Sequence, residues 1–323
     1  MTTLLIATTG GHLAQLWALR PRLAIEGDVL WVTHRNAQSE ALLAGEQVEY
    51  VPYVRTRSIV DVVRRLPHAH SLLHGRRVTA AWSTGSGIAV GYLPYLAARG
   101  VACHYVESAT RVSGPSLTGR LLQLAPRVHL YTQHPGWATG RWQFGGTVFD
   151  GYRSEPRPVE QSGALKVVVT MGTDEELDLR RIIEHLAAVL RPDGPLEQYC
   201  GASLEVLWQT GRTPVDGLGI EASPFVPFDR LSAALAAADL VISHAGVGSA
   251  LAALDAGHVP VLVPRDPSRG EAVDDHQREI ATLLAERGLA VSAPAEQVDV
   301  ELLCSAMSRR ITRSTASAAF SLR

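Results

Sequence analysis

The chain has 323 residues, 46% hydrophobic and 19% charged, which is enough for two globular domains of ordinary size. Its start, MTTLLIATTGG, lacks the basic region and long apolar stretch of a secretory signal, and no apolar run of 18 residues follows. Three distant cysteines in no metal-binding spacing fit a reducing cytoplasm, so we expect a cytoplasmic protein without a spanning helix.

Charge is unevenly divided along the chain. Residues 1–160 carry 16 basic and 10 acidic side chains, whereas residues 161–323 carry 14 and 22. The first half gathers arginines among apolar residues, at Arg55, Arg57, Arg64, Arg65, Arg76 and Arg77. This pattern fits an amphipathic helix on an anionic membrane surface and, equally, a solvated helix face. Nucleic acid is disfavoured because no aromatic residues are interleaved with these arginines.

The first half alternates predicted strands and helices. Strands are predicted at residues 4–7, 29–32, 48–51, 80–83, 102–106 and 128–131. Helices are predicted at residues 12–24, 38–43, 58–75 and 116–124, with another that ends at residue 99. Residues 150–163 are polar with two prolines, which is typical of a linker.

The second half restarts the same alternation. Strands are predicted at residues 166–170, 204–208, 240–242 and 259–263, and helices at 176–190, 229–237, 275–287 and 299–311. The Ser/Ala-rich tail from residue 313 is expected to fray. Such alternation predicts an α/β protein with two Rossmann-like parallel-sheet domains, residues 1–155 and 164–312, that face each other across a cleft and are followed by a 313–323 tail.

The stretch DLVISHAGVGSALAALDAGHVPVLVP, residues 239–264, is the most informative part of the sequence. A strand runs into the turn His244-Ala245-Gly246-Val247-Gly248-Ser249, which opens an Ala/Leu-rich helix. Glycines let the backbone approach a ligand closely, and a helix N-terminus offers N–H groups to an anion such as phosphate. The pattern therefore predicts a phosphate site.

Other candidate residues also follow predicted strands. Gly10-Gly11-His12 follows the first strand, and histidine is the usual proton carrier near neutral pH. Thr84-Gly85-Ser86-Gly87 follows another strand and could bind phosphate or only allow close helix packing. Glu107 ends the strand 102–106, where it would face the cleft as a base or pair with Arg111.

In the second half, Met171-Gly172-Thr173 ends a strand, and Thr173 is expected to cap the following helix. Asp274-Asp275-His276-Gln277 follows a long loop. No second cluster of carboxylates or histidines accompanies it, so Asp275 is expected to cap a helix rather than hold a metal. The chain lacks a GxSxG, a Walker sequence and a GxGxxG with its acidic partner, which disfavours hydrolases, NTPases and dehydrogenases.

Taken together, these motifs resemble the GT-B glycosyltransferases of the lipid-linked saccharide branch (family 28). The segments that carry the resemblance are Gly10-Gly11-His12, YVESATRVSGPSLTGRLL (105–122), VVVTMGTDEELDLRR (167–181), SHAGVGSALAALDAG (243–257) and DDHQ (274–277). The chain looks like a fusion of the two-subunit enzyme that adds the second N-acetylglucosamine to dolichyl diphosphate. It is also similar to the transferase that forms lipid II and to bacterial exopolysaccharide glycosyltransferases.

The resemblance implies a hexosyltransferase that moves a sugar from a UDP-sugar to a polyprenyl-diphosphate-linked saccharide, with inversion and without a metal or other cofactor. His12 or Glu107 would be the base. The implied donor site comprises Gly172, Thr173, Gly211, Phe225, His244, Gly246, Gly248, Ser249, Asp255, Asp275, His276 and Gln277. The implied acceptor site comprises Gly10, Gly11, Thr84, Gly85, Ser86, Gly87 and Arg111. The enzyme would be peripheral on the inner face of the plasma membrane.

The chain departs from the family at one donor contact. Ala252 stands where the family has its ribose-binding glutamate, and Asp255, one helical turn later, is the candidate replacement. Arg265 and Arg269 flank the donor loop, where they would read a uronate carboxylate or lie solvated. The family's membrane anchor helix has no counterpart, so membrane contact would fall to the basic 55–77 region.

Three alternatives stay open at this point. One is a glycosyltransferase that acts on a soluble small molecule, and another is a UDP-sugar epimerase on the same fold. The third is a non-catalytic partner that binds nucleotide sugars, which the missing glutamate at position 252 would allow. Flotation with liposomes separates the membrane enzyme from the others, and consumption of a UDP-sugar without acceptor identifies an epimerase.

Overall fold

The computed structural model describes residues 1–23, 25–54, 60–61, 64–157, 163–172, 179–272, 275–314 and 320. The chain forms two compact units. Unit 1 contains Met1–Asp150 together with Phe320, and unit 2 begins at Gly151 and takes up the rest of the described chain.

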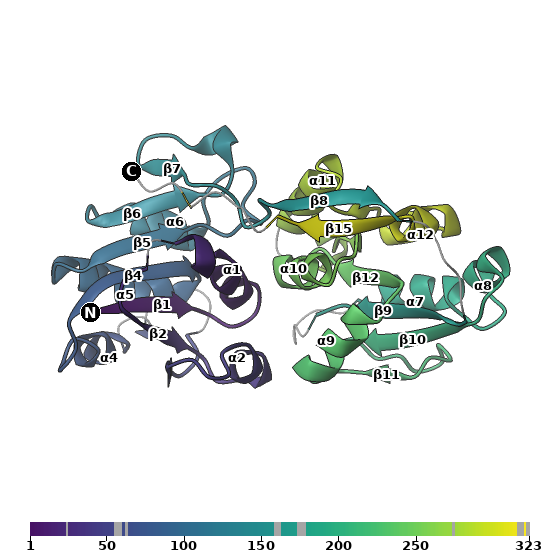
Figure 1. The fold of residues 1–323 in the computed structure, drawn as a ribbon, viewed down its shortest axis with the longest axis horizontal. Coiled ribbons are helices and arrows are strands. Elements are labelled where there is room, and N and C mark those ends of the chain that lie inside the picture. The colour runs from purple at the N-terminus through teal and green to yellow at the C-terminus, as the bar shows by residue number, and fades with distance from the viewer. Residues whose placement is uncertain are drawn as a thin grey trace. The chain divides into compact units, whose positions relative to one another are not determined.

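Unit 1 is built on a seven-stranded sheet in which every neighbouring pair of strands is parallel (Figure 1). The strands are β1 (Thr2–Ala7), β2 (Asp28–Thr33), β3 (Val48–Tyr50), β4 (Val78–Gly85), β5 (Ala102–Val106), β6 (Val128–Thr132) and β7 (Trp142–Phe144). Their order is β3-β2-β1-β4-β5-β6-β7. The chain therefore builds outward from β1 on one side and then returns to place β4 on the other.

Helices cover this sheet. They are α1 (Gly11–Leu19), α2 (Ala37–Leu42), α4 (Leu66–Ser71), α5 (Gly87–Ala98) and α6 (Leu117–Leu122). Buried side chains of α5, among them Tyr92 and Leu96, form a core with Leu4 and Ile6 of β1. These two residues of β1 share a face because side chains alternate along a strand.

Unit 2 repeats this plan with a six-stranded parallel sheet. The strands are β9 (Leu165–Thr170), β10 (Leu204–Gln209), β11 (Ala222–Ser223), β12 (Leu240–His244), β13 (Val261–Val263) and β14 (Val291–Ser292), in the order β11-β10-β9-β12-β13-β14. The helices are α7 (Arg180–Val189), α8 (Pro195–Cys200), α9 (Phe228–Ala236), α10 (Val247–Asp255), α11 (His276–Glu286) and α12 (Val300–Met307). Isoleucines 182 and 183 of α7 pack with Val167 and Val169 of β9 in the core.

The predicted linker at residues 150–163 is wrong in its first part. β8 (Tyr152–Pro156) pairs antiparallel with β15 (Arg309–Arg313), and Figure 1 shows the two strands side by side in unit 2. The predicted helix at 299–311 accordingly stops at Met307. Composition could not reveal this pair because each strand's partner lies more than 150 residues away in the sequence.

Two other expectations are corrected. The predicted helix 58–75 is interrupted, since α4 begins only at Leu66 with Pro67 in its first turn, where a missing N–H costs nothing. Residue Phe320 of the tail is 2% exposed, and its N–H donates to the carbonyl of Arg22 (2.9 Å). The tail is therefore tied to unit 1 at this residue.

No helix within the described ranges is long and apolar enough to cross a membrane.

Candidate functional site

Many of the predicted site residues lie at one place in each sheet. In unit 1 the chain leaves β1 and β4, which are neighbours, in turns that lead to α1 and α5. In unit 2 the corresponding pair of neighbouring strands is β9 and β12. The order of the strands reverses at these points, and open parallel sheets bind ligands at the carboxyl ends of strands there. Each unit therefore has one candidate subsite.

His12 is fixed in the first turn of α1 by the end of β4. Its Nδ1 lies 2.6 Å from the carbonyl oxygen of Thr84, and the Thr84 hydroxyl donates to the His12 carbonyl (2.7 Å). A carbonyl only accepts, so Nδ1 must carry a proton. In the neutral ring the other nitrogen, Nε2, then holds the lone pair and is a proton acceptor.

The surroundings of His12 favour its neutral form. Burial lowers the pKa of the imidazole, the hydrogen bond to Thr84 opposes this effect, and the positive charge of Arg111 lowers the pKa further. The net shift is downward from the ordinary histidine value. His12 is therefore ready to accept a proton at neutral pH.

Gly85 makes room for this histidine. A Cβ atom at Gly85 would lie 3.0 Å from Cε1 of His12 and 3.5 Å from the hydroxyl of Tyr105, and the residue has a φ of +109°. Both the space and the backbone conformation therefore require glycine. The Thr8 hydroxyl accepts from the N–H of Ser86 (3.2 Å), which ties this turn to the end of β1.

The glycine turn before α1 is partly occupied from within the chain. Gln38 accepts the Gly10 N–H (2.5 Å) and donates to the Gly10 carbonyl (3.1 Å). The Leu13 N–H bonds to the carbonyl of Thr8 (3.0 Å). The amides of Gly11 and His12 lie in the first turn of α1, where N–H groups have no partner within the helix.

Glu107 directly follows β5, as predicted. Its side chain does not face open space, because only 1% of the residue is exposed. Its Oε1 accepts from the Tyr105 hydroxyl (3.0 Å) and the Ser108 N–H (3.1 Å). Its Oε2 accepts both the N–H and the hydroxyl of Ser116 (2.9 Å each). Burial raises the pKa of the carboxyl, and these donors oppose that shift. The carboxylate thus binds the start of α6 to β5.

Tyr105 is a residue of this subsite that the sequence analysis missed. Its hydroxyl bonds to Glu107 and lies beside Gly85, which in turn touches His12. The signal was available, because residues two apart in a strand share a face and Glu107 was already a candidate. Arg111, which is half-buried, follows Glu107 in the loop after β5.

In unit 2 a histidine lies against two glycines. A Cβ atom at Gly172 would lie 2.7 Å from Cε1 of His244, and one at Gly246 would lie 2.3 Å from its Nε2. Neither distance is possible for real atoms, so glycine at both positions is what lets the imidazole pack here. Gly172 also has a φ of +80°, which favours glycine independently.

The N-terminus of α10 follows directly. Its N-cap residue, Gly246, carries no side chain, so the first-turn N–H groups are not capped by it. Gly248 and Ser249 lie in this first turn. Backbone amides and the positive end of a helix dipole, on which the predicted phosphate site depends, therefore lie at this turn.

The loop after β13 brings Arg265 to the same subsite. Arg265 is 4% exposed, so the expectation that it lies solvated is wrong, whereas Arg269 is solvated and pairs with Asp266 (3.6 Å) and Glu296 (3.5 Å). The Arg265 guanidinium lies 3.4 Å from the carbonyl of Met171, next to Gly172.

The start of α11 is also near this loop. Gln277 is buried and accepts the N–H of Arg265 (3.3 Å), and His276 is half-buried. Asp275 occupies the N-cap position, but its side chain makes no capping bond and pairs instead with Arg278 (3.3 Å). The capping role expected for the Asp275 carboxylate is therefore wrong, although the helix begins where predicted.

Gly211 and Phe225 lie at the ends of β10 and β11. Gly211 has a φ of +63°, and the side chain of Phe225 is 48% exposed. Gln209 of β10 donates to Thr170 of β9 (2.9 Å) and accepts the Val226 N–H (2.9 Å), so it joins β10 to the segment that carries Phe225. An exposed aromatic ring beside strand ends is suited to stacking on a nucleobase.

Asp255 is not brought to the glycine turn. It lies at the last turn of α10, about 12 Å along the helix axis from its start. The Tyr152 hydroxyl donates to its Oδ1 (2.5 Å), and Arg313 donates to the same atom (2.8 Å). Asp255 thus joins α10 to the β8–β15 pair.

Several predicted residues lie outside the described residues, namely Thr173, Asp274, Arg55 and Arg57. Within the part of the chain that the structure describes, no three His, Cys, Asp or Glu side chains are grouped as a metal site would need.

Known proteins resemble this chain in sequence and in fold. Residues 166–321 match the glycosyltransferase family 28 C-terminal domain. The chain is 28% identical over 324 residues to the UDP-N-acetylglucosamine–N-acetylmuramyl-(pentapeptide) pyrophosphoryl-undecaprenol N-acetylglucosamine transferase of Burkholderia multivorans, covering 91% of this chain and 83% of that protein. The enzyme of the same name from Alcanivorax borkumensis is 29% identical, with 88% and 82% covered.

Solved structures share the fold. MurG of Acinetobacter baumannii superimposes with a TM-score of 0.58 at 20% identity, covering 94% of this chain and 89% of that one. The glycosyltransferase SnogD of Streptomyces nogalater gives a TM-score of 0.60 at 18% identity, with 95% and 90% covered. The GT-B fold and the family resemblance predicted from the sequence are both confirmed.

Proposed function

We propose that this chain, a glycosyltransferase of GT-B fold whose second unit is a family 28 C-terminal domain, transfers a sugar from a UDP-sugar to a polyprenyl-diphosphate-linked saccharide. One observation carries the proposal. The switch point of one unit holds a histidine with an available lone pair, and that of the other holds an uncapped helix N-terminus. The relatives, whose names specify UDP-N-acetylglucosamine and an undecaprenol diphosphate, support this choice of donor and acceptor.

In this proposal His12 is the base. Its Nε2 takes the proton of the attacking hydroxyl while the oxygen bonds to the anomeric carbon and the bond from that carbon to the diphosphate breaks. A single displacement of this kind inverts the anomeric carbon. Glu107 is unsuited to the role because four donors already occupy its buried carboxylate, so we assign it to holding the acceptor side of the site together.

The diphosphate leaves from unit 2. Its growing negative charge would be stabilised by the amides of the first turn of α10, and by those near Gly172, because preorganised dipoles need no rearrangement during the reaction. Groups of the protein itself would thus stabilise the charge of the leaving diphosphate. Gly211 and Phe225 would lie beside the uridine of the donor, and His276 and Gln277 would lie beside its sugar.

Three residues bear on the identity of the donor, namely Ala252, Asp255 and Arg265. Ala252 offers no carboxylate to a ribose, and Asp255 is bonded to Tyr152 and Arg313. Arg265 adds a buried positive charge next to Gly172. If Arg265 reads a uronate, replacing it by glutamine must reduce use of a UDP-hexuronate far more than use of UDP-N-acetylglucosamine.

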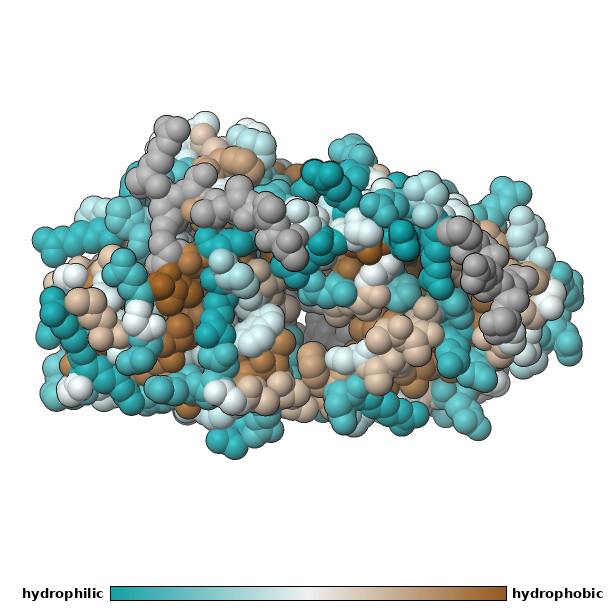
Figure 2. Space-filling model, viewed as in Figure 1, coloured by the Kyte–Doolittle hydropathy of each residue, from teal (hydrophilic) through white to brown (hydrophobic). Residues whose placement is uncertain are grey.

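A lipid-linked acceptor requires contact with a membrane, and unit 1 offers an apolar surface for it. On α6 and just after it, Leu117, Leu121 and Leu124 are 51%, 45% and 80% exposed. Residues 108–149 contain four arginines and no acidic residue. Figure 2 shows hydrophobic side chains reaching the surface among hydrophilic ones. Apolar side chains among basic ones are typical of surfaces that bind anionic lipid.

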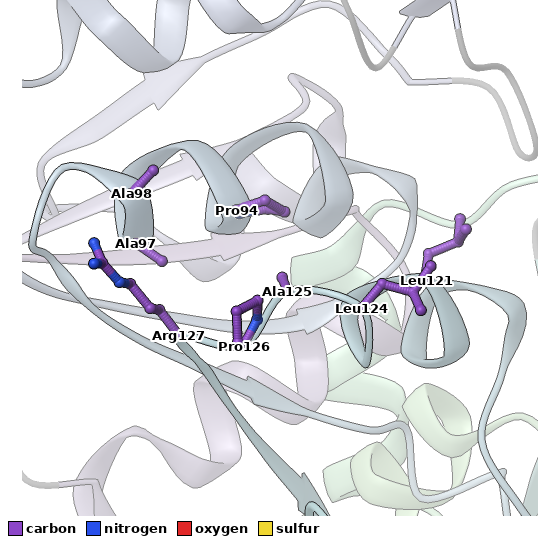
Figure 3. Close-up of a pocket in the computed structure, with 8 residues that line it drawn as sticks. All are labelled: Pro94, Ala97, Ala98, Leu121, Leu124, Ala125, Pro126 and Arg127. Atoms are coloured by element: carbon purple, nitrogen blue, oxygen red, sulfur yellow. The ribbon is translucent and has the colours of Figure 1, made fainter.

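A groove of roughly 470 Å³ runs beside these leucines. Figure 3 shows the residues that line it, from α5 on one side and from α6 with the segment after it on the other: Pro94, Ala97, Ala98, Leu121, Leu124, Ala125, Pro126 and Arg127. We therefore add this surface to the basic region predicted from the sequence, of which Arg64, Arg65, Arg76 and Arg77 are described.

Two experiments test the proposal. First, thermal stability is measured with UDP, UDP-sugars, NAD and ATP, because a ligand that binds only the folded state must raise it. Stabilisation by UDP and one UDP-sugar alone supports the proposal, and no response to any uridine compound refutes it. Second, transfer from that sugar to a short-chain polyprenyl-diphosphate saccharide is assayed, with a soluble glycoside and no acceptor as the comparisons.

Membrane contact is tested by flotation with anionic vesicles. Replacing Leu117, Leu121 and Leu124 by serine should abolish flotation while leaving donor binding intact. Replacing Arg64, Arg76 and Arg77 by serine tests the basic region in the same way. Flotation that survives both sets of changes would contradict the proposed surfaces.

A further inference from the structure

Gln15 lies one turn after His12 in α1 and is 1% exposed. Its Nε2 donates to the Gly11 carbonyl (3.0 Å) and to the Ser108 hydroxyl (3.1 Å). Its Oε1 accepts from the Ala109 N–H (2.8 Å) and from Nε2 of Gln133 (3.1 Å). The amide has two donor and two acceptor positions, and all four are satisfied.

Gln133 extends the connection to a third segment. It is 2% exposed and follows β6. Its Nε2 also donates to the Glu107 carbonyl (3.0 Å), and its Oε1 accepts the Val148 N–H (2.7 Å). Two buried glutamines thus link the first turn of α1, the end of β5 and the end of β6.

Packing alone does not call for these amides. Apolar side chains of similar volume would fill the same space without the cost of burying polar groups, which is recovered only when every group is bonded. What the amides add is direction, because each hydrogen bond fixes the position of one backbone segment against another. The segments fixed here carry His12, Glu107 and the turn to Arg111.

We propose that Gln15 and Gln133 are positioning residues that hold the first turn of α1, and with it the ring of His12, at a set place relative to the ends of β5 and β6. Gln15 acts on His12 through the Gly11 carbonyl, which lies one residue before it. This inference rests on the proposed function for its catalytic consequence, but its structural part does not depend on any substrate.

The test uses the full chain with Gln15→Met and Gln133→Met, which keep side-chain length and remove the hydrogen bonds. We expect kcat to fall about tenfold or more in each, since small displacements of reacting groups carry costs of this order. The KM for the UDP-sugar should stay within about twofold, because the donor residues lie on unit 2. The double variant should lose less than the product of the single losses, since the two amides bond to each other.

A substrate-free measurement separates this inference from the proposed function. The 15N chemical shifts of the His12 imidazole report which ring nitrogen carries the proton. The unchanged protein should show the proton on Nδ1, and both variants should show a mixture of the two forms. This result would stand even if the assay found no transferase activity.

The matched control is Thr3→Val, which removes a buried hydroxyl bonded to the Glu26 carbonyl (3.2 Å) at the opposite end of β1. It should lower thermal stability while leaving kcat and the His12 spectrum unchanged. If Gln15→Met and Gln133→Met behave like Thr3→Val in all three measurements, the amides only stabilise the fold and the inference is overturned.

Discussion

The switch points of the two units are alike in topology and different in chemistry. Both lie between the first strand of the sheet and the strand to which the chain returns, β1 with β4 and β9 with β12. In unit 1 a side chain is held in place by hydrogen bonds, since His12 and Glu107 have five between them from named partners. In unit 2 the absence of side chains at Gly172 and Gly246 makes room for the imidazole of His244, beside an N-terminus of α10 that no side chain caps.

One architecture can therefore support two roles. A proton acceptor needs a defined ring nitrogen and a set position, which unit 1 provides through bonds to Thr84. An anion site needs amides and the absence of bulk, which unit 2 provides at α10. The comparison would fail if the histidine of unit 1 were dispensable or if bulk at the glycines of unit 2 were tolerated.

Removing the base of unit 1 should have the largest effect. His12→Ala should lower kcat at least about 100-fold, because general base catalysis contributes at this scale. Stabilisation by UDP should not change, since the proposed donor residues are on unit 2. His129, an exposed histidine of β6, supplies the matched control, and His129→Ala should leave kcat near that of the unchanged protein. Equal activities for both variants would remove His12 from the mechanism.

Adding bulk to unit 2 should come next. Gly246→Ala places a Cβ atom against Nε2 of His244, so we expect a loss of about 1–3 kcal/mol in the free energy of unfolding and weaker UDP binding. Gly246 has a φ of −87°, so the backbone itself tolerates alanine. Chemical denaturation and UDP titration measure the two effects.

A double variant tests whether the clash with His244 causes the loss of stability. His244→Ala combined with Gly246→Ala should recover stability relative to Gly246→Ala alone, because the clashing ring is gone. Recovery of UDP binding as well would show that the displaced imidazole, and not the added methyl group itself, obstructs the donor. If Gly246→Ala binds UDP as well as the unchanged protein does, the proposed role of this turn is refuted.

The pH dependence of activity tests the role of His12 in unit 1 through a smaller effect. The base must be neutral, and burial together with Arg111 lowers the pKa of His12. Activity should therefore persist as the pH falls past about 6.5, the ordinary histidine value, and decline only below it. Arg111→Gln removes a positive charge that disfavours protonation, so it should move this decline to higher pH. A decline centred above the ordinary value in the unchanged enzyme would contradict the assignment.

Local sequence signals predicted much of this molecule. The two parallel sheets followed from the alternation of apolar runs with amphipathic segments, and the glycine turns were placed correctly because they end buried strands. The β8–β15 pair was missed because its partners are distant in sequence, and the hydrogen bonds of Glu107 were missed because they depend on where α6 starts. The same is true of the Gln15 and Gln133 amides, which look like ordinary polar residues in the sequence.

The smallest expected effects concern Asp255, for which two interpretations of its role predict different results. In the structure its carboxylate accepts from Tyr152 and Arg313. If this structural role is its whole contribution, Asp255→Ala and Tyr152→Phe should each cost about 1 kcal/mol of stability and leave the affinity for UDP unchanged. If Asp255 replaces the family glutamate at the ribose, only Asp255→Ala weakens UDP. Measuring Kd for UDP in both variants decides the matter, since Tyr152→Phe removes the shared hydrogen bond but no carboxylate.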